Sequence, residues 1–152
     1  NRMIKIPPAM MSQSWLGSDF TNDDLLREAS VVSDYTHTVI GDETVNGHES
    51  WKIELIPKEE AAVVWGKVVL WVSKEHYLEL KAEFYNEDGE LKNTMVLSDI
   101  QKMGGRMLPT HWEMIPADEE GKKTVLELES ADFQKEIPES FFSQQNMKRI
   151  RP

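Results

Sequence analysis

Apolar and polar residues alternate along most of the chain with a period of two. The alternation is clearest in residues 51–55, 78–84 and 126–129, where every second residue is apolar. This period is typical of β-strands that bury one face and leave the other in water. Residues 35–40 are rich in β-branched and aromatic side chains, which favours a further strand.

Turn-forming residues separate these runs. Asn46-Gly47 lies between two strand-like segments and predicts a tight hairpin, because both central turn positions need positive φ. Further turn residues cluster at 57–60, 73–76, 86–89, 104–105 and 118–121. We expect seven or eight consecutive antiparallel strands in one meander, with no βαβ unit. The predicted class is mainly β (α+β), with one or two short helices.

The chain ends hold the predicted helices. Residues 17–26 resemble a capped helix start, in which Thr21 or Asp19 accepts from free backbone N–H groups and Asp23 and Asp24 favour the positive end of the dipole. Residues 137–142 predict a short closing helical turn. Residues 2–6 predict a strand, ended by Pro7-Pro8, whose outer edge is left open.

One strand departs from the alternation, because residues 67–73 are apolar on both faces. Val68, Leu70 and Val72 form one face, and Val69 and Trp71 form the other. Such a strand is expected to be covered on both sides. Two interpretations stay open: an ordinary central strand under the helix, or a strand whose Val69 and Trp71 meet a partner or an absent segment.

The alternating strands collect their apolar residues on one face. The chain holds five Trp and eight Met, and Met is common at adaptable binding surfaces. This face is either a plain hydrophobic core or the concave inner face of a sheet that holds a flexible apolar ligand. The predicted ligand-binding residues are Trp51, Ile53, Leu55, Leu78, Leu80, Phe84, Leu97, Trp112, Met114, Leu126 and Leu128.

Composition narrows the function. The formal charge of −10 disfavours binding to nucleic acid and to anionic membrane surfaces. The sequence has no cysteine, and no apolar run is long enough for a transmembrane helix. The four histidines match no metal motif, and the acidic pairs lie in turns or at a helix start. We therefore predict no catalytic residue, no metal and no cofactor.

Two segments carry a family resemblance. Residues 15–25, Trp-Leu-Gly-Ser-Asp-Phe-Thr-Asn-Asp-Asp-Leu, resemble the helix start of outer-membrane lipoprotein-sorting proteins, the LolA/LolB-like periplasmic lipoprotein carriers. Residues 137–149 resemble the C-terminal end of that family, and residues 2–7 resemble the strand before the first motif. The resemblance implies an incomplete, strongly curved half-barrel with helices plugging its open side. It also implies that residues 1–152 are one such domain, a C-terminal fragment without the family's N-terminal part.

The resemblance implies a function in the bacterial periplasm. Such proteins carry the acyl chains of lipoproteins towards the outer membrane, so we expect a non-enzymatic carrier of lipoprotein acyl chains or another lipid. A membrane-anchored acceptor or an envelope transport protein would be its partner. The alternative is an accessory interaction module of an envelope transport system, with the sheet as its docking surface. An enzyme built on this half-barrel is disfavoured, because Glu and Lys fall on the face opposite the apolar row.

Overall fold

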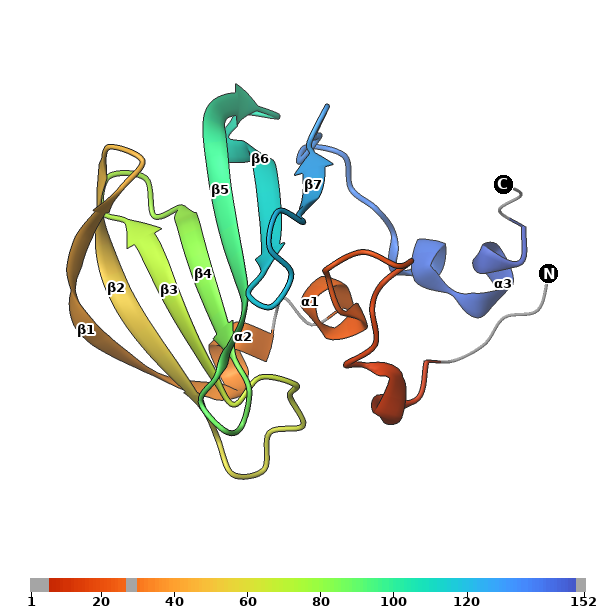
Figure 1. Cartoon of the computed structure of the whole chain (residues 1–152). Helices are drawn as coiled ribbons and strands as arrows, with labels where there is room; N and C mark the ends of the chain where they lie inside the picture. Colours follow the sequence, from red (N-terminus) through yellow and green to blue (C-terminus); the bar gives the residue numbers. More distant parts are fainter. Residues whose placement is uncertain (1–5, 27–29, 150–152) are drawn as a thin grey trace.

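An antiparallel sheet of seven strands dominates the computed structural model, which describes residues 6–26 and 30–149. Each strand pairs with its neighbours in sequence, so the strands follow one another in a meander (Figure 1). The sheet is strongly curved and does not close into a barrel, which confirms the predicted fold class. The strands are β1 (Tyr35–Val45), β2 (His48–Pro57), β3 (Lys67–Ser73), β4 (Glu79–Tyr85), β5 (Leu91–Met103), β6 (Arg106–Pro116) and β7 (Thr124–Glu127).

Turns and bulges shape this sheet. Asn46 and Gly47 join β1 to β2 with φ of 49° and 84°, which confirms the predicted hairpin turn. The register shifts in β1 between Val39 and Gly41, and in the β3–β4 pair it skips Leu80. An extra residue on one strand bends that strand and increases its twist, so these bulges contribute to the curvature.

The helices are short: η1 (Pro8–Met10), α1 (Asn22–Leu26), α2 (Ser30–Ser33), η2 (Glu139–Phe142) and α3 (Gln144–Met147). The predicted cap of α1 is confirmed. Thr21 Oγ1 accepts from the Asp24 N–H (3.1 Å), and Asp24 Oδ2 accepts from the Thr21 N–H (2.8 Å). In the described part of the chain, no helix combines the length and the apolar character that crossing a membrane requires.

Two predictions at the chain ends have different outcomes. The closing helical turn predicted at 137–142 is present as η2. The strand and open edge predicted at residues 2–6 lie outside the described residues, apart from Ile6.

The strand register gives the sheet two faces of opposite character. One row of paired residues, which we call the apolar face, runs Ile53, Leu70, Ala82, Met95 and Met114 from β2 to β6. The row beside it, on the other face, begins with Lys52, Trp71 and Lys81, and we call this the polar face. The sheet therefore separates apolar from charged side chains, as the alternation predicts.

Trp71 corrects both interpretations of the doubly apolar strand β3. Its side chain lies on the polar face and is only 1% exposed. The indole Nε1 donates to Glu43 Oε2 (2.8 Å), and Lys81 Nζ and Lys52 Nζ lie 4.2 and 4.7 Å from the ring centroid. The stems of long charged side chains can bury an aromatic ring while their heads stay in water. Charged side chains of neighbouring strands, rather than a helix or a partner, thus cover Trp71.

A small hydrophobic core lies where β1 begins and β2 ends. Tyr35, Leu55 and Val68 are each 5% exposed or less and pack together. Side chains from outside the sheet cover them, and α2 lies at this end of the sheet (Figure 1). The partly buried residues packed on the cluster are Val31, Ile53, Val63, Trp65, Leu70 and Phe84.

Candidate functional site

The predicted binding residues come together on the apolar face. Leu55 pairs with Val68 and Val68 with Phe84, while Leu97 pairs with Trp112 and Trp112 with Leu126. Leu78 and Leu128 lie just outside the strands. The Leu78 carbonyl accepts from the Ser73 N–H, and the Leu128 N–H donates to the Thr110 carbonyl, both at 2.8 Å. That this face binds a ligand stays a prediction.

The eleven predicted binding residues fall into a buried group and a half-buried group. Leu55, Leu80, Leu97 and Met114 are at most 4% exposed. The half-buried members are Trp51, Ile53, Leu78, Phe84, Trp112, Leu126 and Leu128. None of the eleven residues is classed as exposed. Because some are buried and others only half-buried, the rest of the chain covers this face unevenly.

The N-terminal segment covers one end of the apolar face. The Asp19 N–H donates to Thr124 Oγ1 (3.0 Å), the Thr124 hydroxyl donates to Asp19 Oδ2 (2.6 Å), and Asn93 Nδ2 donates to the Asp19 carbonyl (3.3 Å). Thr124 pairs with Met114, and Asn93 pairs with Phe84, so both anchors lie on the apolar face. Asp19 therefore attaches this segment to β5 and β7.

Aromatic side chains complete this closure. Phe20 is 2% exposed. Trp65 Nε1 donates to Asp24 Oδ1 (2.9 Å), and the Trp65 ring centroid lies 5.3 Å from that of Phe84. We call the region around Leu55, Phe84 and Met114 the closed end. We call residues 17–24, which Asp19 and Asp24 attach to Thr124 and Trp65, the plug, because the resemblance implies helices that plug the open side of the half-barrel.

The opposite end of the apolar face holds a pocket of about 580 Å³. Leu80 and Leu97, both predicted binding residues, lie in its wall and are nearly inaccessible, so they form its floor. We call this region the open end. The complete lining consists of Asn46, His48, His76, Leu80, Leu97, Ser98, Asp99, Ile100, Gln101 and Met107.

Two turns and a stretch of β5 bring the polar lining residues together. Asn46 and His48 belong to the β1–β2 hairpin, His76 to the β3–β4 turn, and Asp99 to β5. No motif in the sequence marks these residues as a site. Their proximity could have been inferred from the meander, because alternate turns of a meander lie at the same end of the sheet.

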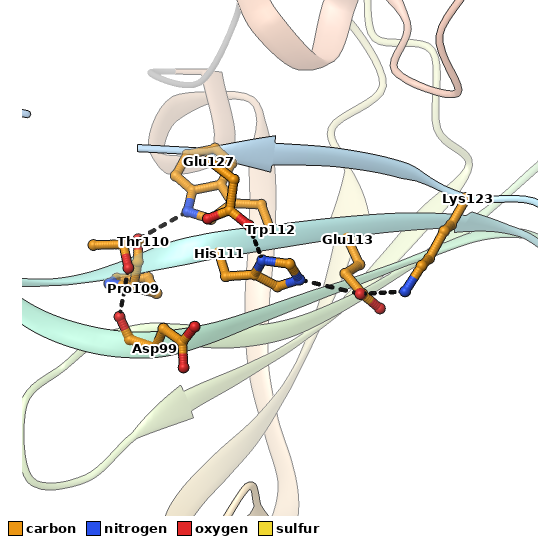
Figure 2. Close-up of polar contacts among 8 residues, drawn as sticks. All are labelled: Asp99, Pro109, Thr110, His111, Trp112, Glu113, Lys123 and Glu127. Carbon is orange, nitrogen blue, oxygen red and sulfur yellow. Dashed lines mark hydrogen bonds and ion pairs between the residues drawn. The ribbon is translucent and has the colours of Figure 1, made fainter. Parts of the chain in front are cut away.

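Asp99 has an unusual backbone conformation inside β5. Its φ is 52°, a left-handed value that Asp and Asn adopt more readily than most residues. Thr110 on β6 is 4% exposed, and its hydroxyl donates to the Asp99 carbonyl (2.8 Å), as Figure 2 shows. This cross-strand hydrogen bond holds the pocket wall at Asp99.

The polar face of β6 and β7 carries an ionisable cluster (Figure 2). His111 Nδ1 contacts Glu127 Oε1, His111 Nε2 lies 3.1 Å from Glu113 Oε1, and Lys123 Nζ also contacts Glu113 Oε1. Hydrogen bonds to Glu113 and then Glu127 raise the pKa of His111. Hydrogen bonds from Lys123 and then His111 lower the pKa of Glu113. The cluster fastens β7 to β6 on the face opposite the pocket floor.

Within 6–26 and 30–149, no three His, Asp or Glu side chains are grouped so that they could hold a metal ion. The cluster around His111 consists of salt bridges within β6 and between β6 and the chain at β7.

Comparisons with known proteins agree on the fold. A family model described as an uncharacterized protein matches residues 1–149. No curated protein matches the sequence. A DUF1329 family protein from Desulfovibrio piger is 23% identical and aligns with a TM-score of 0.82 over 90% of this chain and 56% of that protein.

Two further solved structures carry descriptions related to lipoprotein sorting. A domain described as a candidate outer membrane lipoprotein-sorting protein, from Vibrio parahaemolyticus, is 28% identical, with a TM-score of 0.82 over 95% of this chain and 60% of that one. A LolA superfamily protein from Nitrosomonas europaea is 27% identical, with a TM-score of 0.74 over 89% and 60%. The chain therefore resembles the lipoprotein-sorting family named from its sequence motifs, and it spans 60% or less of each relative's length.

Proposed function

The chain belongs to the family whose model spans residues 1–149, and on that premise we propose that it is a non-enzymatic periplasmic carrier of acyl chains. Its cargo would be lipoprotein acyl chains or another lipid, bound on the apolar face and passed to a membrane-anchored acceptor or an envelope transport protein. The similarity to a LolA superfamily protein supports a carrier-like fold.

The observation that carries this proposal is the open end of the apolar face. Leu80 and Leu97 are apolar, belong to the sheet and border a pocket of about 580 Å³. Small-molecule sites typically occupy about 300–1,000 Å³ and are apolar with a few polar groups. The half-buried Trp51 and Trp112 extend the apolar surface from this region.

Release is as important as binding for a carrier. Apolar burial contributes roughly 25 cal/mol per Å², so several acyl chains could supply ample binding energy. A pocket that stays partly open to water buries a ligand incompletely, and this keeps its affinity moderate. Handover then requires an acceptor whose apolar site is more complete.

A second candidate is the accessory interaction module. Val39 and Ile40 on β1 are 61% and 48% exposed, and β1 is the first strand of the sheet. An edge strand with exposed apolar residues can pair with another chain. If the full-length chain binds another protein through β1 and co-purifies without lipid, that result supports the interaction module over the carrier.

The test introduces a charge at the open end. In the full-length protein, Leu80→Glu should abolish co-purification of lipid, measured by lipid extraction and mass spectrometry, and leave the circular dichroism spectrum unchanged. Water in the pocket can solvate the new carboxylate, whereas an unpaired carboxylate in a packed core costs several kcal/mol.

Two variants serve as controls. Ile56→Glu places the same charge on the polar face at a residue that is 42% exposed, and lipid binding should persist. Leu55→Glu at the closed end should unfold the protein. A folded Leu80→Glu variant with unchanged lipid content would exclude this face as the cargo site.

A further inference from the structure

The chemistry of the open-end pocket points to a class of ligand. We infer that the pocket binds the polar end of an amphiphile whose headgroup is uncharged and bears hydroxyl groups, such as a glycerol ester. This inference rests on the proposed function, because the acyl chain of the same ligand would lie on the apolar face.

The pocket is amphipathic along its depth. Its floor is formed by Leu80 and Leu97, which are 1% and 4% exposed. Its rim is polar and comes from the hairpin residues Asn46 and His48, the turn residue His76 and a stretch of β5. A ligand that satisfies both parts must have an apolar and a polar section that are joined end to end.

Most polar residues of the rim carry side chains that both donate and accept hydrogen bonds. Amide and imidazole groups both donate and accept hydrogen bonds, which matches the donor and acceptor character of an alcohol. The rim residues with such groups are Asn46, His48, His76 and Gln101. Hydroxyl groups on a bound headgroup would find complementary partners here in either orientation.

The only fixed charge among the lining residues is the carboxylate of Asp99, and no Lys or Arg contributes to the lining. An anionic headgroup would meet Asp99 without a compensating cation, and like charges placed together reduce affinity. A hydroxyl group can instead donate to this carboxylate. The pocket should therefore discriminate against fatty-acid anions and phosphate headgroups.

The test compares three ligands that share one tail. Binding of 1-monolauroylglycerol, laurate and dodecylamine to the full-length protein is measured by isothermal titration calorimetry at about pH 7.5, below their micellar concentrations. We expect monolauroylglycerol to bind about tenfold more tightly than laurate, since laurate would place a second carboxylate beside that of Asp99. Dodecylamine carries an ammonium group that the Asp99 carboxylate attracts, so its affinity relative to that of monolauroylglycerol decides whether the preferred headgroup is a cation or an alcohol.

Asp99→Asn isolates the headgroup contribution. Asn tolerates the left-handed φ of 52°, so the variant should keep the fold. Removing the carboxylate should strengthen laurate binding severalfold and leave monolauroylglycerol binding within about twofold. Asp88→Asn, in the turn between β4 and β5 and outside the pocket lining, is the matched control and should change neither affinity.

The outcomes separate the two proposals. Equal binding of the three ligands, or tightest binding of laurate or dodecylamine, overturns the headgroup assignment and leaves the carrier function standing. An Asp99→Asn variant that binds laurate no better than the wild type also overturns it. If no lauroyl ligand binds at all, both the carrier function and the headgroup assignment are wrong.

Discussion

The two ends of the apolar face are made by the same strands but have different surroundings. At the closed end, Leu55 and Met114 are inaccessible: Trp65 and Phe84 pack on the cluster around Leu55, and Asp19 bonds to Thr124 beside Met114. At the open end, Leu80 and Leu97 are as apolar and nearly as buried, yet they border a pocket with a polar rim. One sheet therefore supplies a packed core at one end and a candidate binding surface at the other.

This difference shows that strand pattern alone does not decide between core and site. Both ends have the same alternation of apolar and polar residues, and both lie on the apolar face of the same sheet. What differs is the segment laid over them: residues 19–24 and Trp65 at one end, and turns with Asn46, His48 and His76 at the other. The segments that cover the sheet therefore determine which end is a packed core and which end is a candidate binding surface.

The largest expected effect tests packing at the two ends. Leu55→Ala should lower the free energy of unfolding by about 2–5 kcal/mol, because it leaves a cavity in a region that cannot collapse. Leu80→Ala should cost clearly less, because its neighbourhood already contains an accessible pocket. Urea denaturation of both variants checks this, and equal losses would remove the distinction between the ends.

The next effect tests the anchor of the closed end. Asp19→Ala removes the hydrogen bond that the Thr124 hydroxyl donates to its carboxylate, and bonds to charged groups contribute about 1.5–3 kcal/mol. Thr124→Val removes the same hydrogen bond from the other side, together with the bond that the Asp19 N–H donates to Thr124 Oγ1. In a double-mutant cycle the two losses should not add, because both report one interaction. Additive losses would show that Asp19 and Thr124 stabilise the protein independently of each other.

A smaller effect is expected at the open end. Tyr77 is 75% exposed, and its ring centroid lies 5.8 Å from that of Trp51. Tyr77→Ala should cost less than about 1 kcal/mol, because an exposed aromatic pair contributes little beyond its modest burial. Thermal unfolding measures the loss. A loss as large as that of Leu55→Ala would show that the open end is packed like a core.

The smallest effect concerns pH and the attachment of β7. Contacts with Glu113 and Glu127 raise the pKa of His111 above its ordinary value of 6.5. The stabilisation from protonated His111 is therefore complete below pH 6.5 and is lost as pH rises through the higher folded-state pKa. The pKa of Glu113 is lowered, first by Lys123, so this carboxylate stays charged across the window.

The measurement compares wild type with His111→Gln. The difference in melting temperature should be largest near about pH 5.5 and should shrink towards about pH 8.5. Hydrogen exchange should report faster opening of β7 at the higher pH, near Glu127 rather than near Thr124. A difference that does not change with pH would show that His111 contributes only through packing.

The sheet could be predicted from the sequence because the residue patterns that specify strands and hairpins are local. The alternation at 51–55 and the turn at Asn46-Gly47 act over a few residues, so strands and hairpins follow from neighbouring side chains. Trp71 was misinterpreted, because the side chains that cover it, Glu43 and Lys81, come from other strands and depend on register. The pocket rim escaped notice for the same reason, since its residues are far apart in sequence.

The candidate site was predicted in part. The apolar row from Trp51 to Leu128 follows from strand parity, and the structure brings these residues together. Which of them are core and which can meet a ligand depends on contacts such as Asp19 with Thr124. No pattern in the strands themselves encodes that contact.

The meander has a consequence for how the chain folds. Each strand pairs only with its sequence neighbours, so the loops that close during pairing are short, and hairpin can be added to hairpin at low entropic cost. The contact of Asp19 with Thr124 spans 105 residues and needs both β7 and the N-terminal segment. We expect the plug to dock after the transition state for sheet formation, so that substitutions at Asp19 accelerate unfolding and leave the refolding rate nearly unchanged.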